Sequence, residues 1–514
     1  MTLFAFPCIF LLAVVSYIAY EHANKVSRFP LPPGPPKWLW AGNYFQLPVI
    51  HPWKTYASWA KLYGPLTHLR YFGQTTIILN TGKAATDLLE SRSALYSDRP
   101  VWVMGALAGR ARSAFHIPYD HPRFRSYRKM LHSGLNPRIT RTYRPIQEHE
   151  LTTLLKNLSE TPENFISHLR RNAAGMVLKV AYGYEVSAGS DDFIDRIENF
   201  FQETEKRLSR PYLVDFFPYL QYLPEWFPFV DFKRIAREHR SMDVESFTYN
   251  WAKKLIASGN HNNSFVSHFL QHDGHNAPGE EEEEAIKWCS AALYIGGADT
   301  TVSVMTSFFY LMMMYPEVQA HAQAEIEEVI GTDRLPTLDD RACLPFIGAL
   351  IKEIIRWGPV APLGLRHRVK EDDVYSGYHI PKGATVIANI CYILTHILFR
   401  PERHMGSHPE TDPYKFVWGF GRRACPGEQF AAIKVYHPNS YLSLIIAGAH
   451  LAELSLFLNI SNILATFHIN KALDARKREV EPQIEWSNAT VSHIKPFNCR
   501  ITPRPISALA LLAD

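Results

Sequence analysis

Residues 418–427 read Trp-Gly-Phe-Gly-Arg-Arg-Ala-Cys-Pro-Gly, and they are the most informative part of this 514-residue chain. Glycines on both sides of Cys425 allow backbone amide groups to approach its sulfur. Two nearby cations, Arg422 and Arg423, also stabilise negative charge there. Such surroundings favour a thiolate, which can act as a nucleophile, a redox thiol or a metal ligand. No Cys–His–Asn pattern accompanies the cysteine to support the nucleophile.

The same stretch contains a spacing found in dinucleotide-binding loops, G-x-G-x-x-A, at Gly419, Gly421 and Ala424. A genuine loop of that kind lies within a βαβ unit and is followed about 20 residues later by an acidic residue that binds ribose. The sequence shows neither feature around this stretch. We therefore reject a dinucleotide site.

The stretch resembles the cysteine loop of the cytochromes P450, the heme-thiolate monooxygenases, whose pattern is F-x-x-G-x-R-x-C-x-G. Gly421, Arg423, Cys425 and Gly427 match it, whereas Trp418 stands where phenylalanine is usual. The resemblance implies a heme b cofactor, with Cys425 as the axial thiolate and metal ligand and Arg423 as a contact of a heme propionate. A thiolate ligand donates electron density to the iron and favours O–O cleavage. The implied fold is mainly α with a small β region.

Residues 285–315 form a segment that is apolar on nearly all sides. The acidic residues 281–284 precede it and favour a helix start. A second membrane span is one alternative for a segment of this length. An Asp in mid-segment, Asp299, argues against a span, because ionisable groups in membrane helices are rare and costly. We expect a buried central helix.

That segment contains Gly296-Gly297-Ala298-Asp299-Thr300-Thr301. Taken alone, the motif also suits a site of close helix packing with a buried, paired Asp. It resembles the family's [AG]-G-x-[DE]-T motif, which lies over the distal face of the heme. The resemblance implies that Thr300 hydrogen-bonds dioxygen or a water and that Asp299 relays protons. Oxygen activation requires two protons delivered to a dry site.

Glu353 and Arg356 form an E-x-x-R pair, and residues at i and i+3 share one face of a helix. The pair has no specificity by itself. Its place before the cysteine loop resembles the structural pair of the family, and Arg403 matches the third member. We expect these three residues to support the fold and not the chemistry.

Weaker matches follow from position. Arg128 resembles the arginine of the family's W-x-x-x-R propionate contact, although Phe124 replaces the Trp and an indole donor is lost. His367 resembles another propionate contact. A surface cation remains the alternative for each. Two other histidine spacings are interpreted as solvated loop residues: His268 with His272, and His404 with His408.

Residues 2–20 carry no charge and would span about 29 Å as a helix, one hydrocarbon core. A cleaved signal peptide is the alternative, but a basic n-region and a clear cleavage site are missing. Positive charge at Lys25 and Arg28 predicts that the following chain faces the cytosol. We expect a single-pass protein of the endoplasmic reticulum membrane. Its parts are an anchor at residues 1–21, a linker with a Pro-rich hinge at 22–37, and the monooxygenase domain at 38–514.

Composition excludes several other classes. Lys plus Arg total 54 against 50 Asp plus Glu, a net charge of +4, so a basic nucleic-acid surface is not expected. The six cysteines include no C-x-x-C pair, which excludes a disulfide framework or a zinc module and fits a reducing compartment.

The expected partners follow from the resemblance and from the lack of a flavin or nicotinamide motif in the sequence. With no flavin or nicotinamide fingerprint in the chain, electrons must come from a separate NADPH-cytochrome P450 reductase, and Arg125, Lys129 and Arg422 are candidates for its docking face. Besides O2 and membrane lipid, we expect a lipophilic small-molecule substrate, in fungal secondary metabolism. Apolar and aromatic segments predict the lining of its cavity: residues 101–116, 200–232 and 361–365.

Two departures from the family pattern flank the cysteine loop. The connection at residues 397–400 is about ten residues shorter than usual, and residues 430–449 form an insert before an expected helix at 450–467. They leave two alternatives open. One is a heme-thiolate isomerase or dehydratase that uses no O2, against which the intact Asp299–Thr300 pair argues. The other is an inactive heme-binding membrane protein, which the insert favours.

Overall fold

The structure is a computed structural model that describes residues 29–187, 191–208, 210–260, 262–271, 278–394, 398–426 and 451–504. The predicted anchor, Gly427 and the insert at 430–449 lie outside the described residues. No helix in these described ranges is both long enough and apolar enough to cross a membrane.

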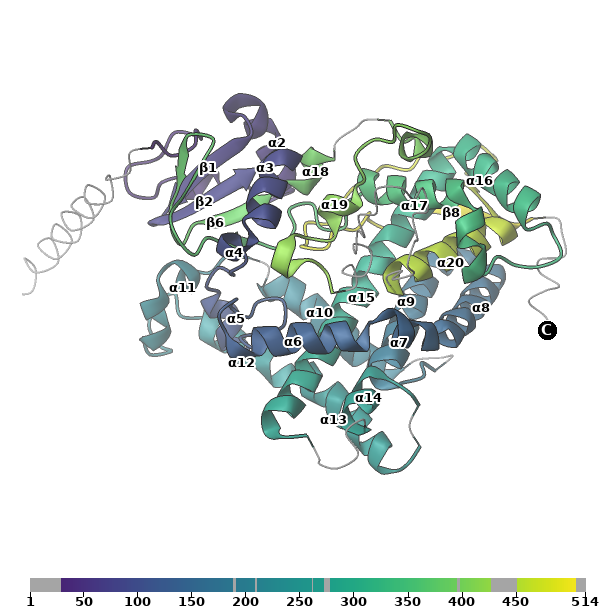
Figure 1. Ribbon diagram of the computed structural model, residues 1–514, viewed down its shortest axis with the longest axis horizontal. Helices are drawn as coiled ribbons and strands as arrows, with labels where there is room; N and C mark the ends of the chain where they lie inside the picture. Colours follow the sequence, from purple (N-terminus) through teal and green to yellow (C-terminus); the bar gives the residue numbers. More distant parts are fainter. Residues whose placement is uncertain are drawn as a thin grey trace, which may run out of the picture.

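Helices make up most of the described chain, as predicted (Figure 1). The longer ones are α2 (Pro52–Tyr63), α6 (Pro122–Gly134), α8 (Arg144–Glu160), α9 (Phe165–Tyr182), α10 (Asp192–Leu208), α12 (Phe232–Met242), α13 (Val244–Ala257), α15 (Glu280–Met314), α16 (Pro316–Val329), α17 (Pro345–Trp357) and α20 (Leu451–Thr466). The short α-helices are α3 (Gly82–Ala85), α4 (Ser93–Tyr96), α5 (Val103–Leu107), α7 (Pro137–Thr142), α11 (Leu213–Phe216), α14 (Phe265–Gln271), α18 (Ile390–Ile393) and α19 (Tyr414–Val417). Single turns of 3₁₀ or π helix are η1 (Tyr44–Gln46), η2 (Thr86–Ser91), η3 (Pro162–Asn164), η4 (Pro218–Tyr222), η5 (Leu338–Cys343), η6 (Pro401–His404) and η7 (Gly421–Arg423).

A small sheet lies at one end of the molecule (Figure 1), with strand order β1-β2-β6-β3. Its strands are β1 (Leu66–Tyr71), β2 (Gln74–Leu79), β3 (His367–Arg368) and β6 (Thr385–Ala388). β1 and β2 form a hairpin whose two turn residues, Phe72 and Gly73, both have positive φ, as a tight type I′ turn requires. β6 then pairs in parallel with β2, so two segments about 300 residues apart in sequence meet in one sheet, the small β region that the resemblance implies. Two further pairs are β4 (Asp373–Tyr375) with β5 (Tyr378–Ile380), and β7 (Phe467–Lys471) with β8 (Cys499–Pro503).

The central helix is α15, as the sequence predicts. Four glutamates, at residues 280–283, occupy its first turn, where negative charge is favourable, and Pro316 begins the next helix just after its end. Most of its second half is buried. Val177 of α9 approaches so closely that a Cβ on Gly297 would lie 2.9 Å from the valine Cγ2 atom. Gly297 therefore allows the two helices to pack tightly.

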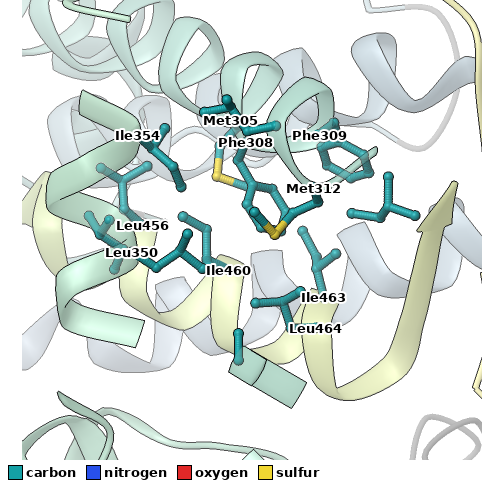
Figure 2. Close-up of a cluster of buried hydrophobic side chains, with 14 of the residues drawn as sticks. Met305, Phe308, Phe309, Met312, Leu350, Ile354, Leu456, Ile460, Ile463 and Leu464 are labelled. Atoms are coloured by element: carbon teal, nitrogen blue, oxygen red, sulfur yellow. The ribbon is translucent and has the colours of Figure 1, made fainter. Parts of the chain in front are cut away.

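The main core lies where α15, α17 and α20 meet (Figure 2). Met305 and Phe308 of α15 pack with Ile354 of α17 and with Ile460 of α20. All four side chains are fully or almost fully buried. The helix expected at residues 450–467 is thus confirmed as α20, and it is buried in the core after the insert.

Candidate functional site

The cysteine loop is held in a tight turn by its own backbone. The Cys425 amide donates a hydrogen bond to the Trp418 carbonyl at 2.7 Å. Gly419 and Gly421 both have positive φ, at 83° and 51°. A Cβ on Gly421 would also lie 2.4 Å from the Ser93 Cβ atom. Both glycines are therefore required here, one for conformation alone and the other for conformation and space.

Two of the predicted arginines converge on this loop. Arg128 of α6 donates through Nη1 to the Ala424 carbonyl at 2.7 Å, directly before the cysteine. Arg423 donates through Nε to the Ser97 carbonyl at 2.8 Å, and its guanidinium carbon lies 4.3 Å from the ring centroid of Phe124. Phe124, which stands where the family has Trp, thus provides a cation–π contact for Arg423 in place of an indole donor.

Buried guanidinium atoms of Arg99, Arg128 and Arg423 form one group with the buried ring of His367, which we call the buried cationic cluster. The sequence analysis missed Arg99. Arg99 donates to the carbonyls of Phe115, Leu365 and Arg366, at 2.9, 3.2 and 2.6 Å. His367 contacts the Tyr96 carbonyl through Nδ1 at 2.7 Å. Arg99 follows Asp98 in the loop between α4 and α5, and no motif surrounds it. The sequence therefore did not distinguish it from a surface cation.

Burial and mutual repulsion disfavour positive charge in this cluster. Burial, followed by the charge of Arg423, lowers the pKa of Arg99 to about 9. Burial, and then the charge of Arg99, lowers the pKa of His367 to about 3. Burial likewise lowers the pKa of Arg423 to about 10, while Asp98 acts in the opposite direction.

These residues fit a ligand that brings carboxylates next to Cys425. Among the described residues, no group accepts a hydrogen bond from the buried Nη1 atom of Arg423. An unpaired buried guanidinium N–H costs free energy unless an acceptor reaches it. The two propionates of a heme would supply such acceptors. Two other cysteines suit a thiolate poorly, because burial raises the pKa of Cys391 to about 11 and that of Cys499 to about 12.

The Asp299–Thr300 motif has an arrangement that the sequence did not predict. The Thr300 hydroxyl donates to the Gly296 carbonyl at 2.6 Å, one turn earlier in α15. Asp299 contacts His493, with 3.0 Å between Oδ1 and Nε2. Consecutive residues of a helix do not face each other, so the acid and the hydroxyl act from different sides of α15. His493 is 194 positions away in sequence, and no local signal marked it.

The predicted structural pair is buried and joined as expected. Arg356 donates to Glu353 through Nε at 2.7 Å and through Nη2 at 2.9 Å, and Arg403 donates through Nε at 3.0 Å. Arg356 also donates to the carbonyls of Leu394 and Leu398, on either side of residues 395–397. The triad therefore links α17 to Leu394, before the short connection, and to Leu398, within it.

The interpretation of His404 as a solvated loop residue is wrong. Its side chain is 2% exposed, and Nε2 lies 3.0 Å from Oε2 of Glu353. The prediction failed because Glu353 lies 51 positions earlier in sequence and the fold alone brings the two together. His408 is exposed as predicted, His268 is half-buried in α14, and His272 lies outside the described residues.

The three segments predicted to line a substrate cavity all approach α15 or the cationic cluster. Phe115 lies over Gly296, where an added Cβ would be 3.6 Å from the phenylalanine Cζ atom. Phe201 stacks on Tyr294 of α15, with 5.7 Å between ring centroids. The Arg99 bond to the Leu365 carbonyl brings the third segment to the same region. A small cavity above α15 is lined by Tyr182, Phe200, Phe201, Tyr294 and Ile295, among others.

Comparison with known proteins identifies relatives over nearly the whole chain. A family model described as Cytochrome P450 matches residues 32–436. Cytochrome P450 monooxygenase claR of Ampulloclitocybe clavipes is 40% identical over 95% of this chain and 89% of its own length. Cytochrome P450 monooxygenase 208 of Postia placenta is 37% identical over 98% and 96%, and cytochrome P450 monooxygenase ppsD of Aspergillus oryzae is 36% identical over 92% and 89%.

Proposed function

The chain belongs to the cytochrome P450 family of oxygenase enzymes, and we propose that it inserts one oxygen atom of O2 into a lipophilic small molecule. The observation that carries this proposal is the buried cationic cluster beside Cys425, together with Asp299 and Thr300 on α15. The family implies a small-molecule substrate, O2, heme with a cysteine thiolate ligand and a redox partner. The fungal origin of the relatives named above supports a role in fungal secondary metabolism.

In this proposal Cys425 holds the iron of heme b through its thiolate. Arg99, Arg128, Arg423 and His367 would hold the propionates, because Arg128 bonds the cysteine loop and the charge of Arg423 reaches both Arg99 and His367. Gly421 gives the loop its turn, and Gly427 matches the last glycine of the family's pattern. When bound, the heme supplies the redox chemistry that activates O2. Glu353, Arg356 and Arg403 support the loop from α17 and take no part in the chemistry.

Protons reach the reaction through α15. The overall change consumes the substrate, O2, two electrons and two protons, and it yields the hydroxylated product and water. Asp299 is half-buried and carries a carboxylate that can take a proton from the solvent side. The Thr300 hydroxyl already donates to the Gly296 carbonyl, so its oxygen is left to accept a hydrogen bond from a water.

The electrons come from a membrane-bound NADPH-cytochrome P450 reductase. Arg125 and Lys129 are exposed one turn apart on α6, the helix that bonds the cysteine loop through Arg128. Arg422 is exposed on the loop itself. We expect these three exposed cations to lie on one docking face, which suits an acidic partner. The uncharged residues 2–20 anchor the chain in the endoplasmic reticulum membrane with the catalytic domain in the cytosol.

The first test is the ligand of the iron. Full-length protein, reduced and treated with carbon monoxide, should show the red-shifted Soret band of a thiolate complex. Cys425→Ala should abolish that band, whereas Cys343→Ala, a change at an exposed cysteine, should leave it unchanged. Oxygen uptake on adding reductase and NADPH then tests the oxygenase activity. A normally folded protein without the red-shifted band would reject the assignment of Cys425.

A further inference from the structure

A hairpin near the C-terminus, residues 485–495, packs along α15. A β-bridge between Trp486 and Ile494 joins its two sides, and the Lys495 amide donates to the Glu485 carbonyl at 2.7 Å. The Ser492 amide donates to the Val360 carbonyl at 2.8 Å, which fixes the tip of the hairpin to the segment after α17. The hairpin is therefore fixed independently of α15.

Two successive residues of this hairpin meet two successive turns of α15. Ser303 donates through its hydroxyl to the Ser492 carbonyl at 2.7 Å, and the Ser303 residue is fully buried. Asp299 lies four positions before Ser303, so the two side chains share one face of the helix. His493, the residue after Ser492, contacts Asp299 there at 3.0 Å.

The backbone of His493 is also held, which fixes the point from which its ring extends towards Asp299. The His493 amide donates to the Ser487 hydroxyl at 3.0 Å, and its carbonyl accepts from the Ser487 amide at 2.7 Å. The ring is 17% exposed and the Asp299 side chain 38% exposed. The ring thus meets a carboxylate that is accessible to water, at the edge of the proposed oxygen site.

We propose that His493 is the positioning residue of Asp299. It holds the carboxylate through the Nε2–Oδ1 contact, so that Asp299 takes protons from water and passes them inward in a fixed orientation. This inference rests on the proposed function, because the transferred protons are the two that O2 reduction consumes with two electrons from the reductase. Without His493 the carboxylate turns freely in water and its proton transfer becomes slow.

The test uses full-length, heme-loaded protein with reductase and NADPH, and no added organic substrate. His493→Ala should lower the rate of O2 consumption by about 10- to 100-fold, the scale of a misplaced catalytic group. It should also enlarge the rate difference between H2O and D2O. His493→Gln should recover most of the rate, because its amide nitrogen can hold the carboxylate at the same reach. His379→Gln removes another His–Asp contact, on β5, and should change neither quantity.

A second readout is independent of turnover. In protein with ¹³Cε1-labelled histidine, studied as the diamagnetic ferrous carbon monoxide form, His493→Gln identifies the resonance of His493. Asp299→Asn should shift that resonance, and an unshifted resonance would overturn the contact. If wild-type protein consumes O2 and His493→Ala does so at the same rate with the same D2O effect, the positioning role is wrong and the proposed function stands. If wild-type protein consumes no O2, the proposed function fails, and the resonance shift alone decides whether His493 holds Asp299.

Discussion

Gly296 and Gly297 are adjacent on α15, yet they face different parts of the molecule. A Cβ at Gly297 would meet Val177 of α9 at 2.9 Å, whereas one at Gly296 would meet only Phe115, at 3.6 Å. The packing interpretation of the motif therefore holds for Gly297. Gly296 lies on another side of α15, where its Cα faces the loop that contains Phe115. Its carbonyl accepts a hydrogen bond from the Thr300 hydroxyl.

Thr300→Ala should separate oxygen activation from substrate binding. We expect binding to remain largely intact, while product formation falls by about 10²–10⁴-fold because a positioned proton-transfer group is lost. Electrons should then appear as hydrogen peroxide, measured against NADPH consumed. Thr301→Ala is the matched control and should leave product formation unchanged. Thr301 makes the same hydrogen bond to the helix backbone, at 2.7 Å, but it is only 4% exposed and so is buried away from the proposed oxygen site.

Turnover that needs neither O2 nor reductase, and that Thr300→Ala leaves unchanged, would favour the isomerase or dehydratase. A complete lack of turnover with normal heme content would favour the inactive protein and direct attention to the insert at residues 430–449.

At the scale of elements, Glu353 joins α17 to η6. Burial alone would raise the pKa of this carboxyl, but hydrogen bonds from His404 and Arg356 outweigh it and lower the pKa to about 2. Because the folded-state pKa is depressed, the stabilisation is complete above the unfolded pKa of about 4.3. It is lost as pH falls from there towards 2.

Glu353→Gln should destabilise the protein by about 3–5 kcal/mol, because the buried Arg356 and Arg403 would lose the negative charge of Glu353, although Arg403 keeps its ion pair with Glu410. The melting temperature, followed by circular dichroism, should fall at pH 7. It should also depend less on pH between 5 and 3 than that of the wild type. Glu317→Gln, a change at an exposed glutamate of α16, is the control. Equal acid sensitivity in Glu353→Gln and wild type would show that other carboxylates control this range.

Elements with a local pattern could be predicted, and contacts between distant elements could not. The cysteine loop, α15 and the E-x-x-R pair each depend on spacings within one segment. Arg99, His404 and His493 act through partners that only the fold brings near: the Leu365 carbonyl, Glu353 and Asp299. Nothing in their own neighbourhood distinguished these three from solvated side chains.

At the scale of the whole molecule, exposed aromatic side chains occur on two segments that lie close together in space, one near η1 and one near η4. Trp40 is 66% exposed before η1, and Trp226 is 81% exposed after η4. Tyr44 of η1 contacts Phe216 of α11, with 5.8 Å between ring centroids, so the two regions belong to one surface. Aromatic residues of this kind favour the interface between water and lipid.

Deleting residues 2–20 should lower membrane association without unfolding the heme domain, because the hydrophobic clusters of the described chain are built from residues between 47 and 501. Sedimentation with microsomal membranes measures the association, and the carbon monoxide spectrum reports the fold. We expect weak residual binding through the exposed aromatic surface. Trp226→Ser in the deletion variant should reduce this remainder. Full binding by the deletion variant would assign the attachment to that surface instead of the anchor.

If the chain binds heme as proposed, the buried cationic cluster ties the lifetime of the protein in the cell to heme supply. A ligand that binds only the folded state adds RT ln(1 + [L]/Kd) to its stability, about 2.7 kcal/mol at a hundredfold excess over Kd. Chains made faster than heme is delivered would keep Arg99 and Arg423 buried among like charges, which favours opening of this region. Proteases act on opened chains. The abundance of this enzyme would therefore follow the cell's capacity to make heme as well as the rate of its own synthesis.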